Sequence, residues 1–216
     1  MADNYLERKM EEYRTQPTPG RNSKPAQTLT RLLLRNRSHR GYDTAFVVRE
    51  DQLRRINEVN TKIPSARNQQ VLRFRPVLTD EADKILPHIR LGGALPELGL
   101  PFPGTEPRAF IIVCSTVAES RYVDIDLGIS VQSMLLQAAE IGLNGICIGA
   151  FDRERIRQEF RLEPEPLLVL AIGKGIERIE LTAIGAAENH AYYRENGIHY
   201  VPKVRTEELI IPAEHP

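Results

Sequence analysis

Two short basic clusters, far apart in the sequence, carry the side chains best suited to chemistry. The first places Arg37, Ser38 and Arg40 within four residues, and the second places Lys203 and Arg205 two residues apart. Forked guanidinium groups, a compact ammonium and a small hydroxyl are donors that suit a doubly ionised phosphate. If the fold brings the two clusters together, they form a phosphate site. If it does not, each cluster is an ordinary solvated patch.

The segment from Ile63 to Gln70 is the second candidate. Ser65 and Asn68 can both donate and accept hydrogen bonds, which suits hydroxyl and amide groups of a ligand. Gln70 can support them. Pro64 precedes the pair, so the same residues also make an ordinary turn.

Gly149 is the third candidate. It follows the apolar run Ile146–Ile148 and precedes Asp152, a suitable capping residue for a helix. A glycine at this point lets the main chain approach a flat ring without a side chain in between. The other interpretation is a simple connection between a strand and a helix.

Together these segments match, in order and rough spacing, the flavin-binding segments of the FMN-dependent nitroreductase family, which the chain resembles over residues 26–210. It departs from the family pattern at Asn36, where an arginine is common, and at Val71 and Leu72, where proline and tryptophan are usual. The cofactor-binding residues that the resemblance implies are Arg37, Ser38, Arg40, Pro64, Ser65, Asn68, Gln70, Gly149, Lys203 and Arg205.

The resemblance also implies how these residues are used. The two basic clusters would hold the phosphate and ribityl chain of FMN. The segment from Pro64 to Gln70 would reach the flavin from the neighbouring subunit, and the Gly149 N–H would donate to the flavin N5.

The implied function is an FMN-dependent oxidoreductase. It would pass hydride from NADH or NADPH through the flavin to a small nitroaromatic or quinone acceptor, with ping-pong kinetics. Because the flavin carries the chemistry, no side chain is expected to be catalytic. The alternatives are a dehalogenase, an enal reductase or a flavin reductase of the same family, a non-catalytic flavin-binding protein, and an interaction module without flavin.

Composition sets the broad class. The chain has 216 residues, of which 29 are basic and 29 acidic, so it lacks the overall basic field of a nucleic-acid-binding protein. Its five histidines and two cysteines show no metal-ligand spacing, so no metal site is expected. Cys114 and Cys147 lie in apolar runs and are expected to be buried and unpaired. No segment has the pattern of a signal peptide or a membrane span, which predicts a cytoplasmic protein without a membrane partner.

The order of the expected elements indicates the α+β class. Hydrophobic periodicity predicts helices over 26–36, 50–59, 124–141 and 153–160, and strands over 71–78, 109–114, 146–149 and 167–172. Gly142 is expected to end the long helix in a left-handed conformation, and Asp152 to cap the helix that follows. The resemblance implies a mixed, mainly antiparallel sheet flanked by helices, in an interlocked homodimer.

Three larger segments complete the expected organisation. Residues 1–25 would be an N-terminal extension with a short helix over 4–14 and a linker, and residues 26–216 a single FMN-binding domain. Helix 124–141 is apolar almost all round, which is typical of a domain centre or a subunit interface. The loop 95–108, rich in proline and glycine, is either a lid or a surface connector.

Two other motifs are rejected. Gly173 and Gly175 begin like a dinucleotide fingerprint, but Arg178 stands where a third glycine is needed. Asp124 and Asp126 are two residues apart on a helix and do not face each other, so favourable charge at the start of the helix explains them better.

Overall fold

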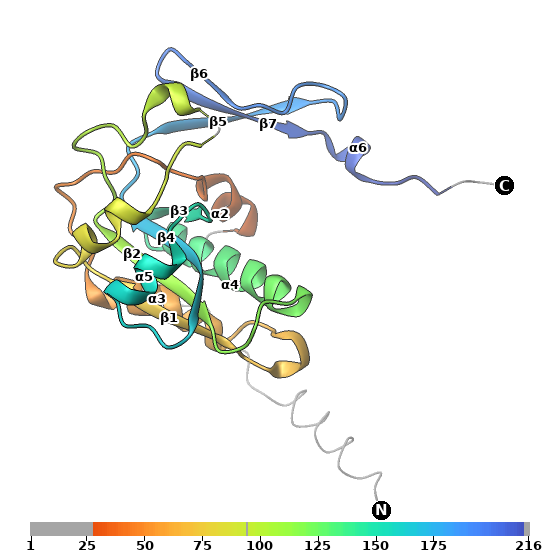
Figure 1. Ribbon diagram of the computed structural model, residues 1–216. Coiled ribbons are helices and arrows are strands. Elements are labelled where there is room, and N and C mark those ends of the chain that lie inside the picture. Colours follow the sequence, from red (N-terminus) through yellow and green to blue (C-terminus); the bar gives the residue numbers. More distant parts are fainter. Residues whose placement is uncertain (1–27, 94, 214–216) are drawn as a thin grey trace, which may run out of the picture.

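The computed structural model describes residues 28–93 and 95–213 of the 216-residue chain. Figure 1 shows a main body, in which helices cover a sheet, and a smaller sheet that extends to one side of it. The expected extension over 1–25, with its helix, lies outside the described residues.

The main sheet has four antiparallel strands in the order β1-β2-β4-β3. The strands are β1 (Leu72–Val77), β2 (Ala109–Ser115), β3 (Asn144–Ile148) and β4 (Glu165–Gly173). β2 and β4 are central, and because both of their faces are covered, their apolar runs are almost continuous. The predicted α+β class and the mainly antiparallel sheet are confirmed.

Helices cover both faces of this sheet. On one face Ile111 of β2 packs in a cluster with Met134, and on the other Phe110 packs in a cluster with Ile156. Alternate side chains of one strand point to opposite faces, so β2 divides the core into two layers. The helices of the main body are α2 (Leu29–Arg35), α3 (Glu50–Glu58), α4 (Arg121–Glu140) and α5 (Arg153–Glu159). Short 3-10 turns lie between α3 and β1 and between β1 and β2: η1 (Val59–Thr61), η2 (Ala66–Asn68), η3 (Ala82–Lys84), η4 (Leu86–His88) and η5 (Pro96–Leu98).

The smaller sheet contains β5 (Arg178–Ile184), β6 (Tyr193–Glu195) and β7 (Ile198–Val204). β7 is the middle strand, parallel to β5 and antiparallel to β6. Asn196 and Gly197 connect β6 to β7 with positive φ values of 50° and 77°, as a two-residue hairpin turn requires. Lys203 lies in β7. Arg205 lies just beyond it, as the N-cap of α6 (Thr206–Leu209).

Local capping signals explain where the helices begin and end. α4 begins at Arg121, three residues before the prediction, because the Ser120 side chain accepts a hydrogen bond from the Val123 N–H. The expected cap at Asp152 is confirmed by its 3.0 Å hydrogen bond from the Arg155 N–H. Gly142, with φ of 84°, ends α4 as expected.

The expected burial of both cysteines is half right. Cys114 is buried, whereas Cys147 is exposed. β3 is an edge strand, and the side of it that carries Cys147 is not fully covered. Both thiols are free, and burial raises the pKa of Cys114 to about 11.

None of the helices in the described part of the chain has the length and apolarity needed to span a bilayer.

Candidate functional site

The first basic cluster lies in an extended segment, residues 37–42, which we call the basic strap. Ser38 pairs with Gly145 at the start of β3, and Tyr42 pairs with Gly175 just after β4. The strap packs so closely that a Cβ on Gly175 would lie 2.1 Å from the His39 ring. Gly175 therefore makes room for the strap, and no helix follows β4, which confirms that this motif is not a dinucleotide fingerprint.

Arg37 and Ser38 offer free polar groups on the strap. Arg37 is half-buried and donates to the Leu33 carbonyl, while its Nε atom is buried without a partner. Partial burial lowers the pKa of Arg37. No carboxylate in the described part of the chain pairs with this guanidinium. Ser38 is exposed beside it. A charged donor held in place with no acidic partner is a suitable anion ligand.

Arg40 and its neighbour His39 are buried, so this part of the strap is not an ordinary solvated patch. Their exposed fractions are 9% and 6%. The smaller sheet folds back over them, and the Arg40 guanidinium lies 5.1 Å from the centre of the Tyr192 ring. It also donates to the Ser38 carbonyl at 3.3 Å. Arg40 therefore links the strap to the smaller sheet, and its role as a cofactor ligand stays a prediction.

Glu177 lies at the centre of the contact between the basic strap and the smaller sheet. The sequence reasoning missed it. Its carboxylate accepts hydrogen bonds from the N–H groups of Arg40 and Gly41 and from the Arg194 guanidinium. The side chain is only 9% exposed. Glu177 lies in the motif rejected as a dinucleotide fingerprint, and no spacing in the sequence distinguishes it from a surface glutamate.

Two buried imidazoles border this carboxylate. The His39 Nδ1 lies 4.0 Å from Glu177, and His199 of β7 is 3% exposed. Burial is the main cause that lowers the pKa of both rings, and nearby Arg40 lowers both further while Glu177 opposes the shift. Both rings are therefore harder to protonate in the folded protein than in the unfolded chain.

These pKa shifts predict that the folded state loses stability in mild acid. Because the folded-state pKa of His199 lies below its ordinary value of 6.5, the unfolded chain binds more protons as the pH falls through that value. We expect the free energy of unfolding, measured with urea, to fall between pH 7.5 and pH 5.5 by less in His199→Gln than in the wild type. The matched control is His190→Gln, at an exposed position, which should keep the wild-type pH dependence. An unchanged slope in His199→Gln would contradict the prediction.

The two late basic residues have different surroundings, and their role as cofactor ligands stays a prediction. His199 and Lys203 are four residues apart in β7, so they lie on the same face of the strand, which is buried at His199 and exposed at Lys203. Lys203 is exposed and has no ion pair among the described residues. Arg205 lies 3.6 Å from Glu188 and 3.5 Å from Glu208, so acidic partners already share its charge.

The segment from Pro64 to Gln70, which we call the Pro–Ser loop, lies at the other end of α4. Ser65 donates to Asp126 at 2.6 Å, and the Ala66 N–H donates to the same carboxylate at 2.7 Å. Asp126 is 5% exposed, so the interpretation of it as simple charge at the helix start is wrong. The signal that could have found it is an acidic residue on the apolar side of a helix, which is rare without a buried partner.

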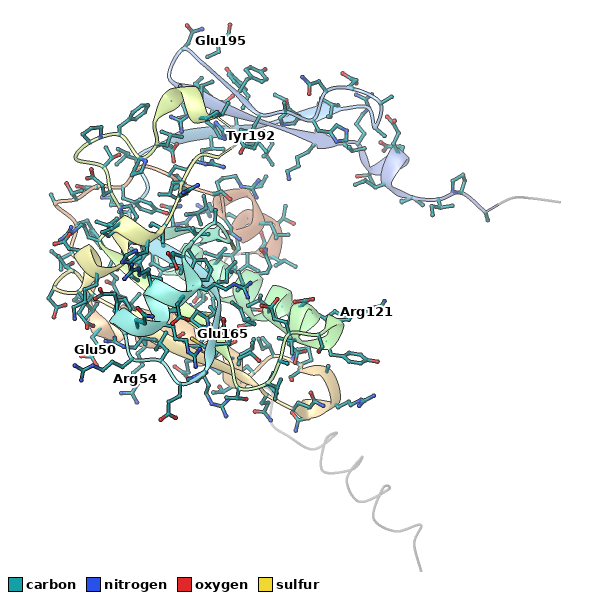
Figure 2. The ribbon with its side chains drawn as sticks, viewed as in Figure 1. Glu50, Arg54, Arg121, Glu165, Tyr192 and Glu195 are labelled. Carbon is teal, nitrogen blue, oxygen red and sulfur yellow. The ribbon has the colours of Figure 1, made fainter. Side chains whose placement is uncertain are left out.

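One chain does not bring the basic strap and the Pro–Ser loop together. The strap crosses Gly145, which follows α4, whereas the loop is held by Asp126 near its start. Gly145 packs beside Leu135, nine residues from Asp126, so at 1.5 Å per residue α4 separates the two by about 14 Å. Figure 2 shows Arg121 at the far end of α4 and Tyr192 by the smaller sheet.

Gly149 lies beside open space. A Cβ placed on it would have no atom within 4 Å, and the next residue, Ala150, lines a cavity of about 500 Å³. His88 and Arg90 line the same cavity and are tied to the Gly149 segment, since Arg90 N–H donates to the Ala150 carbonyl at 2.9 Å. Arg90 and Leu100 line a second cavity of about 490 Å³, so the proline-rich loop covers space rather than a packed surface.

Among the described residues, no group of three or more His, Cys, Asp and Glu could hold a metal ion.

Fold and site together define an α+β protein with a basic strap at one edge of an antiparallel sheet. The sequence profile of the nitroreductase family matches residues 33–174. MJ1384 of Methanocaldococcus jannaschii, named as a nitroreductase, is 35% identical over 57 residues, which are 26% of this chain and 29% of that relative. The chain thus matches less than a third of that relative's length. On the match of the family profile, this chain belongs to the nitroreductase family.

Solved structures share the fold at low identity. A nitroreductase-like protein of Exiguobacterium sibiricum in complex with FMN has a TM-score of 0.57 and 20% identity, covering 72% of this chain and 91% of its own. A variant of NfnB, an FMN- and NADPH-dependent nitroreductase of a Sphigopyxis strain, has a TM-score of 0.58 and 18% identity. That match covers 69% of this chain and 89% of the NfnB chain.

Proposed function

We propose that this protein is an FMN-dependent oxidoreductase that uses NADH or NADPH to reduce a small electrophilic acceptor such as a nitroaromatic or a quinone. The observation that carries the proposal is Arg37, a half-buried guanidinium on the strap without a carboxylate partner. Membership of the nitroreductase family supports the oxidoreductase class. The FMN complex of the structural neighbour supports the choice of cofactor.

The residues present fit the phosphate end of FMN. The buried, unpartnered Nε of Arg37 is a polar group that the chain itself leaves unsatisfied. With the exposed Ser38 hydroxyl beside it, and with the Lys203 ammonium brought to the same phosphate, it would make a donor set suited to a phosphate dianion. Arg40 and Arg205 would add charge around this set.

The residues near Gly149 fit the flavin ring of FMN. An exposed main chain without a Cβ can approach a flat ring, and the Gly149 N–H would hold the ring at its N5 edge. The bound flavin supplies the redox chemistry, the transfer of hydride from the nicotinamide to the acceptor in two half-reactions. The chain's own part is to bind, orient and shield, and the loop 95–108 would cover the acceptor.

A homodimer is part of the same proposal. In one chain the basic strap and the Pro–Ser loop lie about 14 Å apart along α4, and this separation supports a second chain as the source of one of the two contacts to FMN. Leu29 and Leu34 of α2 and Ile125 of α4 are 63%, 60% and 45% exposed, and a partner subunit would bury them.

The decisive experiment is the visible spectrum of the purified protein before and after anaerobic addition of NADH or NADPH. We expect a yellow protein whose flavin absorption is lost on addition of the reductant. Bound FMN that is not bleached would favour a non-catalytic flavin-binding protein. A colourless chain that takes up no added FMN would overturn the proposal.

A further inference from the structure

Asp126 holds the Pro–Ser loop from inside the protein. Its Oδ2 accepts the Ser65 hydroxyl proton at 2.6 Å and its Oδ1 accepts the Ala66 N–H at 2.7 Å. The carboxylate is 95% buried, given its exposed fraction of 5%. Both oxygens of one buried carboxylate are therefore used to fix the first residues of the loop.

Ser65 passes this constraint to the end of the loop. Its oxygen accepts the Gln70 N–H at 3.0 Å while its single proton goes to Asp126. A hydroxyl has one proton to donate, so Ser65 has none left for a cofactor. Ser65 could therefore contact a cofactor only as an acceptor, because its donor closes the loop instead.

The loop needs such a constraint because its backbone is unusual. Arg67, Asn68 and Gln70 have φ values of 52°, 54° and 48°, in the left-handed region that residues other than glycine rarely adopt. Such conformations persist only where the surroundings hold them. Asn68 is exposed, and its Oδ1 accepts from the Gln70 Nε2 at 3.0 Å. The Asn68 Nδ2 donors are then left for a ligand.

We propose that Asp126 is a positioning residue for the cofactor, which acts by holding Asn68 in the orientation that contacts FMN. Asp126 is buried beneath the loop and does not itself reach the ligand. This inference rests on the proposed function, and it assigns the direct contact of the loop to Asn68 rather than to Ser65.

A double-mutant cycle on the full chain tests this inference, with FMN dissociation constants measured by titration. We expect Asp126→Ala to weaken FMN binding about tenfold, the loss of roughly one hydrogen bond to the ligand. In an Asn68→Ala background the same change should cost less than about twofold, because the contact it positions is already absent. Asp126→Asn should restore most of the affinity, since its amide can accept from Ala66 and donate to Ser65.

The matched control is Ser130→Ala, one turn further along α4. Ser130 is 1% exposed and donates to Asn60 at 2.5 Å, so its loss also removes a buried hydrogen bond. It should lower stability without changing the FMN dissociation constant. If Asp126→Ala does not fold, Ser65→Ala removes the same clamp from the other side and should weaken FMN binding similarly.

The outcomes separate this inference from the proposed function. Wild-type affinity in Asp126→Ala, or a full tenfold loss that persists in the Asn68→Ala background, would overturn the positioning role alone. A wild-type chain that binds no FMN would overturn the positioning role and the proposed function together.

Discussion

Replacing Arg37 by glutamine is expected to weaken FMN binding about a hundredfold while leaving the free energy of unfolding nearly unchanged. A bidentate pair of charge-assisted hydrogen bonds to a phosphate contributes about 3 kcal/mol, which corresponds to that factor. The folded chain itself uses Arg37 little, because its guanidinium contacts only the Leu33 carbonyl and has no acidic partner among the described residues. Cofactor affinity and stability should therefore separate in this variant.

Titration of each variant with FMN, together with urea unfolding of the FMN-free protein, checks this prediction. Arg31→Gln is the matched control, since it removes the same charge from the exposed side of α2 without touching the strap. Its FMN affinity should stay within about twofold of the wild type, apart from a small loss of long-range attraction. If both variants bind FMN equally, the strap is not the phosphate site.

The parts of the fold that were predicted from the sequence depend on local patterns. The continuous apolar run of β2 identified a central strand, and the Asp152 and Gly142 signals identified helix ends that the structure confirms. Each of these features is decided by residues only a few positions apart, which periodicity and capping rules describe well. The family resemblance then supplied the order of the candidate segments.

The parts that were missed depend on contacts between distant residues. Glu177 binds the strap across 137 positions, and Asp126 binds Ser65 across 61. Asp126 was interpreted as helix-start charge and Glu177 was not singled out, because acidic residues are usually exposed. Only the folded chain shows that Asp126 fixes the Pro–Ser loop and that Glu177 fixes the strap. The burial of Arg40 was missed for the same reason, since it is the smaller sheet that covers it.

Replacing Glu177 by alanine is expected to destabilise the protein by about 3 kcal/mol and to loosen the smaller sheet. The variant leaves the Arg40 and Gly41 N–H groups without their acceptor and leaves the Arg194 guanidinium without its partner. Removing one member of a buried ion pair costs about 3–5 kcal/mol, because the remaining charge is desolvated without compensation. Since Arg194 is released, trypsin should cleave after it faster than in the wild type.

Urea unfolding and timed trypsin digestion followed by mass spectrometry measure these two effects. Glu180→Ala is the matched control: Glu180 also pairs with an arginine of the smaller sheet, Arg178, but both side chains are exposed, so about 0.5 kcal/mol or less is expected. Equal stability of the two variants would mean that Glu177 does not hold the sheet on the strap. A loss confined to Glu177→Ala instead means that one buried carboxylate couples the smaller sheet to the basic strap. The sheet that carries Lys203 is then held in place by a residue that need not touch the cofactor.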